Sequence, residues 1–319
     1  MLDTALALLP IFLLIVLGFW MKRSGFVPDA FWAPAEKTTY FITFPALLVF
    51  STARAPLEGV AWGPLALAST GAVLAVFLVA SLSRPLLGVP AATFTSVVQG
   101  SIRPNTYVGL AAAAALFGDA GVALTALCVA GVVPLVNVLA VATLVRHVGD
   151  GSAEAAGRAA TGPAATLKGI VTNPLILACA LGITLNVSGL GLPPVVSPFL
   201  EILGRAALPV GLLAVGAGLA LDTLRTSGGP VLAASVLKLA GVPLAAGVLA
   251  WTLGLTGVPA VVAVAYAALP CSASSYVLAR RMGGDAPCMA GIITFQTLAA
   301  AATLPLVIAA AGRVFGVVP

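Results

Sequence analysis

A polar segment with a proline at its centre, Gln99–Tyr107, interrupts the apolar stretch Ala91–Phe117. The whole stretch is about long enough to cross a bilayer once, at roughly 20 residues per span, whereas neither half is. Pro104 has no amide hydrogen and its ring clashes with the carbonyl group four residues earlier, so a helix breaks or kinks here. Asn105 and Thr106 can cap the helix that restarts. Because a broken helix is costly at membrane depth, we interpret this segment as part of a binding site.

Composition places this segment inside a membrane protein. Of the 319 residues, 61% are hydrophobic and 8% are charged, against about 25% charged residues in soluble domains. A transmembrane barrel would need alternating strands of about ten residues, which the sequence lacks. The basic residues behind the net charge of +5 are scattered at the ends of apolar stretches, so nucleic acid is not an expected partner. We therefore expect an all-α polytopic protein in a lipid bilayer.

The sequence offers no motif for enzyme chemistry. Its four cysteines show no CxxC spacing and no histidine neighbours, so we interpret them as small packing residues. His147 lies in a polar segment and is expected to be a solvated side chain. Zinc, haem and nucleotide-binding motifs are missing from the sequence. We expect no enzyme activity, no metal and no cofactor.

The hydropathy pattern predicts ten membrane-spanning helices. They are Leu2–Met21, Thr38–Ser51, Ala61–Leu82, Ala91–Phe117, Gly121–Val145, Gly169–Val187, Ala206–Leu221, Val231–Leu253, Val258–Ala279 and Pro287–Ala311. One long polar connection, Arg146–Lys168, divides the chain into halves. The stretch from Pro193 to Arg205 is expected to run along the membrane interface before the seventh span begins.

The two halves are related by a nearly constant offset. Pro10 and Gly18 in the first span match Pro174 and Gly182 in the sixth, 164 residues later. Offsets of 164 or 166 also relate Pro45 to Pro209, Gly63-Pro64 to Gly229-Pro230, Pro104 to Pro270, and Gly118-Asp119-Ala120 to Gly284-Asp285-Ala286. A constant offset over so many positions indicates a duplication. Since each unit has five spans, the second unit enters the membrane from the opposite side, as in the inverted repeats of secondary transporters.

This duplication predicts three parts along the chain. Residues 1–145 form the first five-helix repeat, 146–168 a linker, and 169–319 the second, inverted repeat. The basic residues at span ends gather on one side, which the positive-inside rule makes cytoplasmic. We therefore expect both termini outside and the linker in the cytoplasm.

The second repeat contains a matching break at Leu269–Tyr276. Pro270 would break the ninth span as Pro104 breaks the fourth, and one of the serines that follow could cap the restarted helix. In an inverted pair, the two breaks meet near the midplane, and the amino-terminal ends of both restarted helices favour an anion there. The residues expected to bind substrate are Gln99, Arg103, Asn105, Thr106, Ser272, Ser274 and Ser275.

Two basic residues have alternative interpretations. Arg103 is either a fork for a carboxylate, a partner for backbone carbonyls that the break frees, or a side chain that reaches the interface. Lys238, in the middle of the eighth span, either meets an anionic substrate or caps the carboxyl-terminal ends of the upstream half-helices, where a sodium ion could otherwise sit. We favour the capping role. Secondary candidates are Asn137 and Gln296, with Thr294 and Thr297, since such residues more often join helices than bind ligands.

Acidic residues are missing from the centre of every predicted span. A carboxylate proton relay, which is common in proton-coupled carriers, therefore has no candidate residue. Sodium coupling through hydroxyl and carbonyl groups stays open, although Lys238 argues against it.

Several motifs extend along the chain on both sides of the breaks. They are Leu9–Leu13 with Gly18, Phe44–Phe50, Pro104–Thr106 with Gly109, Asn173–Ile176, Ala207–Leu213, Lys238-Leu239 before Pro243, and Leu269-Pro270 with Tyr276–Asp285. By these motifs, essentially the whole chain resembles the auxin efflux carrier family. That family includes plant PIN auxin exporters and bacterial relatives associated with malonate, malate and similar organic anions. The chain departs from the plant members in its short central loop and in lacking an acidic residue in the third span, so we expect a bacterial member.

The resemblance implies a fold similar to that of bile-acid and sodium/proton transporters, in which the fourth and ninth helices cross. It implies that Pro104 and Pro270 are the prolines of this crossover and that Asn105 faces the substrate. Spans one, two, six and seven would form a scaffold, through which the protein could form a homodimer. Spans three to five and eight to ten would form a transport unit that moves in an elevator-type cycle.

These observations predict a secondary carrier of a small organic anion, expected to be a carboxylate, in the bacterial inner membrane. One alternative is a sodium-coupled symporter similar to the bile-acid carriers. Another is a membrane sensor or channel that uses the same scaffold.

Overall fold

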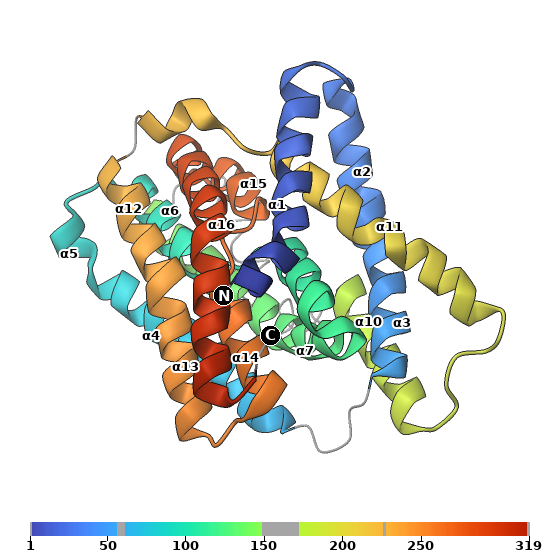
Figure 1. The fold of residues 1–319 in the computed structure, drawn as a ribbon. Helices are drawn as coiled ribbons and strands as arrows, with labels where there is room; N and C mark the ends of the chain where they lie inside the picture. Colours follow the sequence, from blue (N-terminus) through green and yellow to red (C-terminus); the bar gives the residue numbers. More distant parts are fainter. Residues whose placement is uncertain (1, 56–60, 149–171, 226–227, 318–319) are drawn as a thin grey trace.

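The fold is helical throughout the part of the chain that the structure describes. A computed structural model describes residues 2–55, 61–148, 172–225 and 228–317. Within these ranges the regular elements are helices, apart from one isolated β-bridge (Figure 1). Six helices are long and apolar enough to cross a membrane: Leu2–Arg23, Trp62–Leu82, Thr106–Val148, Val196–Ala217, Gly228–Thr252 and Ala286–Phe315. The predicted all-helical class is therefore confirmed for the described residues.

The described helices fall into two sets along the chain. The first half contains α1 (Leu2–Arg23), η1 (Asp29–Phe31), α2 (Trp32–Thr38), η2 (Thr39–Thr43), α3 (Phe44–Arg54), α4 (Trp62–Leu82), α5 (Arg84–Leu87), α6 (Ala91–Ile102) and α7 (Thr106–Val148). The second half contains α10 (Pro174–Val187), α11 (Val196–Ala217), η3 (Leu221–Arg225), α12 (Gly228–Val236), η4 (Leu237–Gly241), α13 (Val242–Thr252), α14 (Gly257–Ala267), α15 (Ser274–Arg281) and α16 (Ala286–Phe315).

Helices lie where the hydropathy pattern predicts spans, with two differences. α7 covers parts of two predicted spans, but Gly118 inside it has non-helical angles (φ 57°, ψ −146°), so two helical segments meet there. α11 is a continuous helix from Val196, so it begins before the seventh span that the hydropathy pattern predicts at Ala206, and the expected path of Pro193–Arg205 along the membrane interface stays a prediction. Its Glu201 and Arg205 form an ion pair one turn apart, which lets both charges stay on the helix. Residues 149–168 of the predicted linker, and 169–171 of the sixth span, lie outside the described residues.

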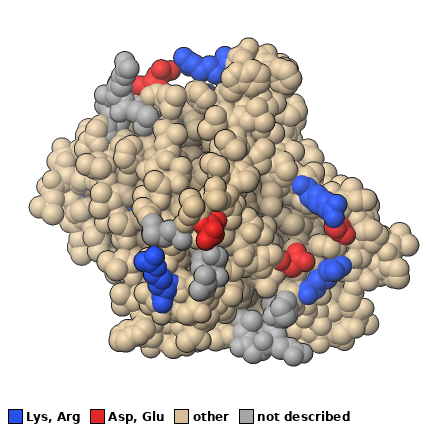
Figure 2. Space-filling view, viewed as in Figure 1, with Lys and Arg blue, Asp and Glu red and all other residues tan. Residues whose placement is uncertain are grey.

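Two helix groups are visible in Figure 1. The first group contains α1–α3, α10 and α11, and the second contains α4, α6, α7 and α12–α16. In the first group α1 packs along α11 and α10 packs along α3, while α4 packs against α13 and α12 against α6 in the second. α7 contacts both groups. Figure 2 shows that charged side chains are few and scattered on the visible face, as expected for a surface that meets lipid.

Glycines allow close helix contacts in the first group, and two of these contacts are related by the repeat offset. A Cβ atom on Gly18 of α1 would overlap the carbonyl oxygen of Leu213 on α11. A Cβ atom on Gly182 of α10 would lie 2.9 Å from the carbonyl oxygen of Val49 on α3. The offset of 164 residues relates Gly18 to Gly182 and Val49 to Leu213. Small residues let spanning helices approach closely, and here the same contact occurs twice.

Two π-helical turns, η2 and η4, interrupt spanning helices. η2 ends directly before Phe44-Pro45 and η4 directly before Val242-Pro243, so each proline is the second residue after its π-helical turn. Because each proline lacks the amide that a regular α-helical turn needs, the backbone before it adopts a wider turn. η4 contains Lys238, so the local distortion lies beside a charged residue.

The glycine contacts predict a stability effect. Gly18→Val should lower the melting temperature of the purified protein in detergent by several degrees, because overpacking costs about 1–3 kcal/mol or more. Gly63→Ala is the control, since nothing lies within 4 Å of a Cβ atom at that position. Equal melting temperatures for Gly18→Val and the wild type would contradict the contact.

Candidate functional site

The two breaks that the prolines predict lie against each other. The chain leaves the helix between α6 and α7 and again between α14 and α15, and Pro104 and Cys271 form an antiparallel bridge there. The Asn105 amide donates a hydrogen bond to the Pro270 carbonyl at 2.8 Å. We call residues 102–106 and 268–275 the crossing. The crossing brings together two segments that lie 166 residues apart in the sequence.

Asn105 caps the helix that follows the first break. Its Oδ1 accepts hydrogen bonds from the amides of Tyr107 at 3.1 Å and Val108 at 3.4 Å, so the predicted cap is confirmed. Its Nδ2 is buried and has no hydrogen-bond partner among the described residues. Thr106 is the first residue of α7 and is partly buried. The cap fixes the Asn105 side chain and leaves an amide donor for a ligand.

The predicted serine cap at the second break is wrong. The residue before α15 is Ala273, whose backbone is already helical (φ −58°, ψ −27°) and which offers no capping side chain. A side-chain cap needs an extended residue at that position. The Ser272 and Ser274 hydroxyls instead hydrogen-bond to each other at 3.0 Å, and Ser275 Oγ accepts a bond from Cys271 Sγ at 3.3 Å.

Arg103 reaches across the crossing to the second break. Its Nη2 donates to Ser274 Oγ at 3.1 Å. Its Nη1 is buried and unpartnered, and the residue is 8% exposed. Ser274 itself is exposed. The guanidinium therefore lies just inside the surface, with one edge occupied by a hydroxyl and the other available.

Lys238 approaches the crossing from η4. Its ammonium donates to the carbonyl of Ala267, the last residue of α14, at 2.8 Å, and the residue is 1% exposed. This is the capping geometry that we favoured over direct contact with substrate. A lysine at a helix carboxyl terminus neutralises the partial negative charge of that end.

Neither buried cation has an acidic partner among the described residues. Within the described ranges, the ion pairs join Arg23 to Asp222 and Arg205 to Glu201. Arg103 and Lys238 take part in none of them. A buried charge without a counter-charge is strongly unfavourable. The crossing is therefore a place where an anion would be stabilised.

Gln99 adds a third group without a partner. The residue is 0% exposed, and neither its Oε1 nor its Nε2 has a hydrogen-bond partner in the described part of the chain. Most buried polar side-chain atoms in proteins are hydrogen-bonded. Gln99, Arg103 and Asn105 each retain an unpartnered buried group, and all three were expected to bind substrate.

The secondary candidates differ in their positions. Gln296 on α16 hydrogen-bonds to both breaks. Thr294 Oγ1 accepts from the Ala220 amide at 2.9 Å, and Thr297 donates to a carbonyl of its own helix. Asn137 is exposed on α7 and forms no part of the crossing.

The first helix group covers the crossing with an aromatic contact. The ring of Phe44, the first residue of α3, stacks on the ring of Tyr107 with centroids 4.8 Å apart and planes 13° from parallel. Sequence reasoning did not find this contact. The sequence marks these two positions only by an aromatic residue beside each motif, Phe44 directly before Pro45 and Tyr107 two residues after Asn105.

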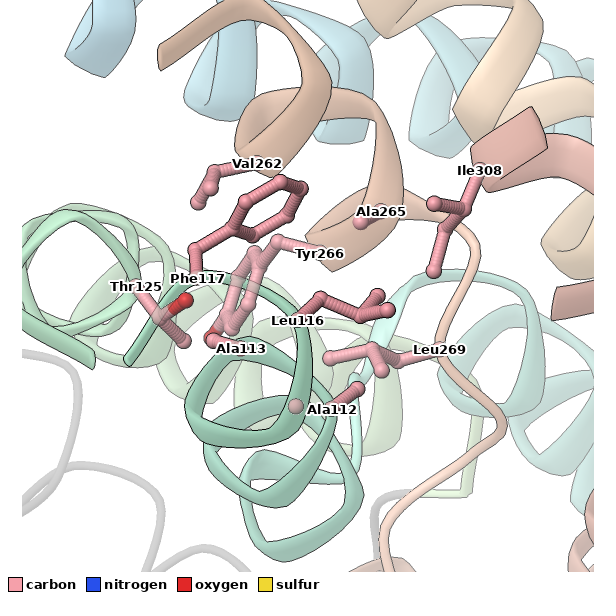
Figure 3. A pocket seen from close by; sticks show the side chains of 11 residues that line it. Ala112, Ala113, Leu116, Phe117, Thr125, Val262, Ala265, Tyr266, Leu269 and Ile308 are labelled. Atoms are coloured by element: carbon pink, nitrogen blue, oxygen red, sulfur yellow. The ribbon is translucent and has the colours of Figure 1, made fainter. Parts of the chain in front are cut away.

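Two small cavities adjoin the crossing. One lies between α7 and α14 and is lined mostly by apolar side chains, including Leu116, Tyr266 and Leu269 (Figure 3). The other is lined by Lys238 and Pro104, among others. The free space in each is about 10 Å³, which is the room of about one water molecule. In this conformation neither cavity has room for an organic substrate.

One comparison with known proteins points to transport. A family described as membrane transport protein matches residues 162–308, which is less than half of the chain. The matched region contains Lys238, the second break and Gln296, while the first break lies outside it. No curated protein matches the chain. Together with the six long apolar helices, the family match indicates an integral membrane protein that works in transport.

The position of Lys238 leads to a prediction. Lys238→Met should weaken binding of a carboxylate at least about tenfold, because a positive charge at the crossing is lost and tenfold corresponds to about 1.4 kcal/mol. The melting temperature should change little. The lost bond to Ala267 is offset by removing a buried charge. Isothermal titration with the tightest-binding member of a panel of short mono- and dicarboxylates measures the effect. Lys37→Met removes an exposed lysine and should bind as the wild type does; equal affinity in Lys238→Met would refute the electrostatic role.

Proposed function

We propose that this protein is a secondary carrier of a small organic anion and that the crossing is its substrate site. The observation that carries the proposal is Arg103, whose guanidinium is buried at the crossing with Nη1 unpartnered and without an acidic neighbour in the described ion pairs. The planar guanidinium group binds carboxylates through two parallel hydrogen bonds. A carboxylate is therefore the substrate group that best fits this side chain.

The helix ends support the same assignment. α7 and α15 both begin at the crossing, and the amino-terminal end of a helix carries about half a positive charge. The Asn105 amide and the nearby ammonium of Lys238 add donors or positive charge to the same region. A site of this kind selects an anion over a cation, because a cation would meet only like charges.

The proposed architecture is a pair of inverted five-helix repeats with crossed broken helices. Its support is the offset of 164 that relates the Gly18–Leu213 contact to the Gly182–Val49 contact, and the offset of 166 that relates Pro104 to Pro270. An inverted duplication would produce both relations. In this proposal the first helix group is the scaffold and the second is the transport unit. Both termini lie outside, and the protein resides in a bacterial inner membrane.

Alternating access is proposed to move the second group past the first. Ser51 of α3 donates to Asp119 Oδ1 of α7 at 3.0 Å, which joins the groups at one end of the long segment of α7. At the other end of that segment, Val148 packs in a cluster with Met282, directly after α15. The exposed Ser274 lies at the start of α15. We infer that the site is closed near Asp119 and reaches solvent near Ser274, so the Ser51–Asp119 bond would break once per cycle.

Coupling to sodium is not part of the proposal. The Lys238 ammonium lies on the carbonyl at the end of α14, and a sodium ion bound by such carbonyls would be repelled by it. A sodium-coupled symporter would lose its driving force when choline replaces sodium, and a channel would show conductance far above carrier turnover. We expect neither behaviour.

Transport by the purified protein in proteoliposomes tests this proposal. Asn105→Ala should reduce saturable carboxylate uptake to about a tenth or less, while the lost cap costs only about 1 kcal/mol of stability. Asn137→Ala, which removes an exposed asparagine, should transport at the wild-type rate. Replacing sodium by choline should leave wild-type uptake unchanged. Undiminished transport by a folded Asn105→Ala variant would overturn the site assignment.

A further inference from the structure

The side chain of Gln296 joins the two breaks. It lies on α16, is 0% exposed, and uses both ends of its amide group. Its Oε1 accepts a hydrogen bond from the Cys271 amide at 2.9 Å, and its Nε2 donates to the Gly100 carbonyl at 3.0 Å. One bond goes to each repeat. Because each end of the amide bonds to a backbone group, Gln296 is placed to join the two breaks.

Each bond satisfies a backbone group that a proline or a helix end has left unpaired. In a regular helix the Gly100 carbonyl would accept from the amide of residue 104, but Pro104 has no amide hydrogen. The Cys271 amide would donate to the Ala267 carbonyl if α14 continued, but that helix ends at Ala267 and its carbonyl accepts from Lys238. Buried backbone groups without partners are costly. Gln296 supplies one acceptor and one donor to them.

Packing on α16 supports the same arrangement. Ile292 lies one turn before Gln296, and a Cβ atom on Gly100 would come within 2.6 Å of the Ile292 side chain. Ile292 and Cys271 also belong to one buried apolar cluster. α16 therefore contacts both breaks through adjacent turns of one face. A side chain of another length at position 296 could not reach both backbone groups.

We infer that Gln296 is a positioning residue that sets the placement of the two breaks relative to each other, and thereby the affinity of the crossing for an anion. The inference rests on the proposed function for its effect on transport. The two hydrogen bonds from Gln296, one to each break, do not depend on the proposed function. Because Gln296 bonds to both breaks, α16 would keep the two breaks in fixed positions relative to each other whenever the second helix group moves.

Gln296→Met tests the inference because methionine has a similar length and removes both bonds. The Michaelis constant for carboxylate uptake should rise about tenfold or more, while the maximal rate stays within about threefold of the wild type. The tenfold change corresponds to about 1.4 kcal/mol. Thr297→Val is the matched control, since Thr297 is equally buried on the same helix and bonds only to its own helix; it should leave both constants unchanged.

A second readout requires no substrate. In a background where Cys128, Cys179 and Cys288 are replaced by alanine, N-ethylmaleimide labelling of the buried Cys271 reports opening of the second break. Gln296→Met should speed this labelling about tenfold, and Thr297→Val should not. Unchanged labelling would overturn the tie between the breaks, even if the wild type transports no carboxylate. Faster labelling with an unchanged Michaelis constant would overturn the positioning role.

Gln296→Glu provides a conservative comparison for the case in which Gln296→Met does not fold. An ionised carboxylate keeps the acceptor for Cys271 but loses the donor for Gly100, and a protonated carboxyl group regains one donor. The Michaelis constant of Gln296→Glu, divided by that of the wild type at the same pH, should fall towards one as the pH is lowered. A ratio that stays constant across the pH range would contradict the need for a donor at this position.

Discussion

The backbone pairing of the two broken helices is the contact on which the rest of the structure depends. The Asn105 amide bonds to the Pro270 carbonyl at 2.8 Å, and Pro104 forms a bridge with Cys271. In a membrane, non-helical backbone survives only where protein satisfies its polar groups. Here each break supplies a partner for the other, and the side chains of Lys238 on η4 and Gln296 on α16 supply further partners. Neither break would be stable without the segment 166 residues away.

The pairing of the two breaks also brings positively charged side chains close to the crossing. The same two breaks that need each other bring Arg103 close to the second repeat and the Lys238 ammonium close to the end of α14. Because the described ion pairs lie elsewhere, the positive charge at the crossing is uncompensated within the described residues. A bound carboxylate would relieve that imbalance, which links the proposed substrate to the way the helices are broken. The Phe44–Tyr107 stack then places the first helix group directly beside the site.

Sequence reasoning predicted the parts of the fold that follow from local physics. The prolines located both breaks, apolar length located the helices, and Asn105 was identified as a cap. The failures arose where tertiary context decides. The expected serine cap does not form because the residue before α15 is Ala273, whose backbone is already helical and whose side chain cannot cap. The reach of Gln296 to both breaks depends on how α16 packs, and a polar residue in an apolar helix gives no hint of its two partners. The exposure of Asn137 likewise depends on which face of α7 is covered.

Anion binding by the crossing is the central claim, and a thermal-shift measurement tests it most directly. The purified protein would be heated with short carboxylates and, separately, with the corresponding neutral amides. A ligand that binds only the folded state raises stability, by about 2.7 kcal/mol at a hundredfold excess over its dissociation constant. The account predicts that at least one carboxylate raises the melting temperature, that its amide does not, and that Arg103→Gln abolishes the shift. Equal shifts with acid and amide, or a full shift in a folded Arg103→Gln variant, would contradict it.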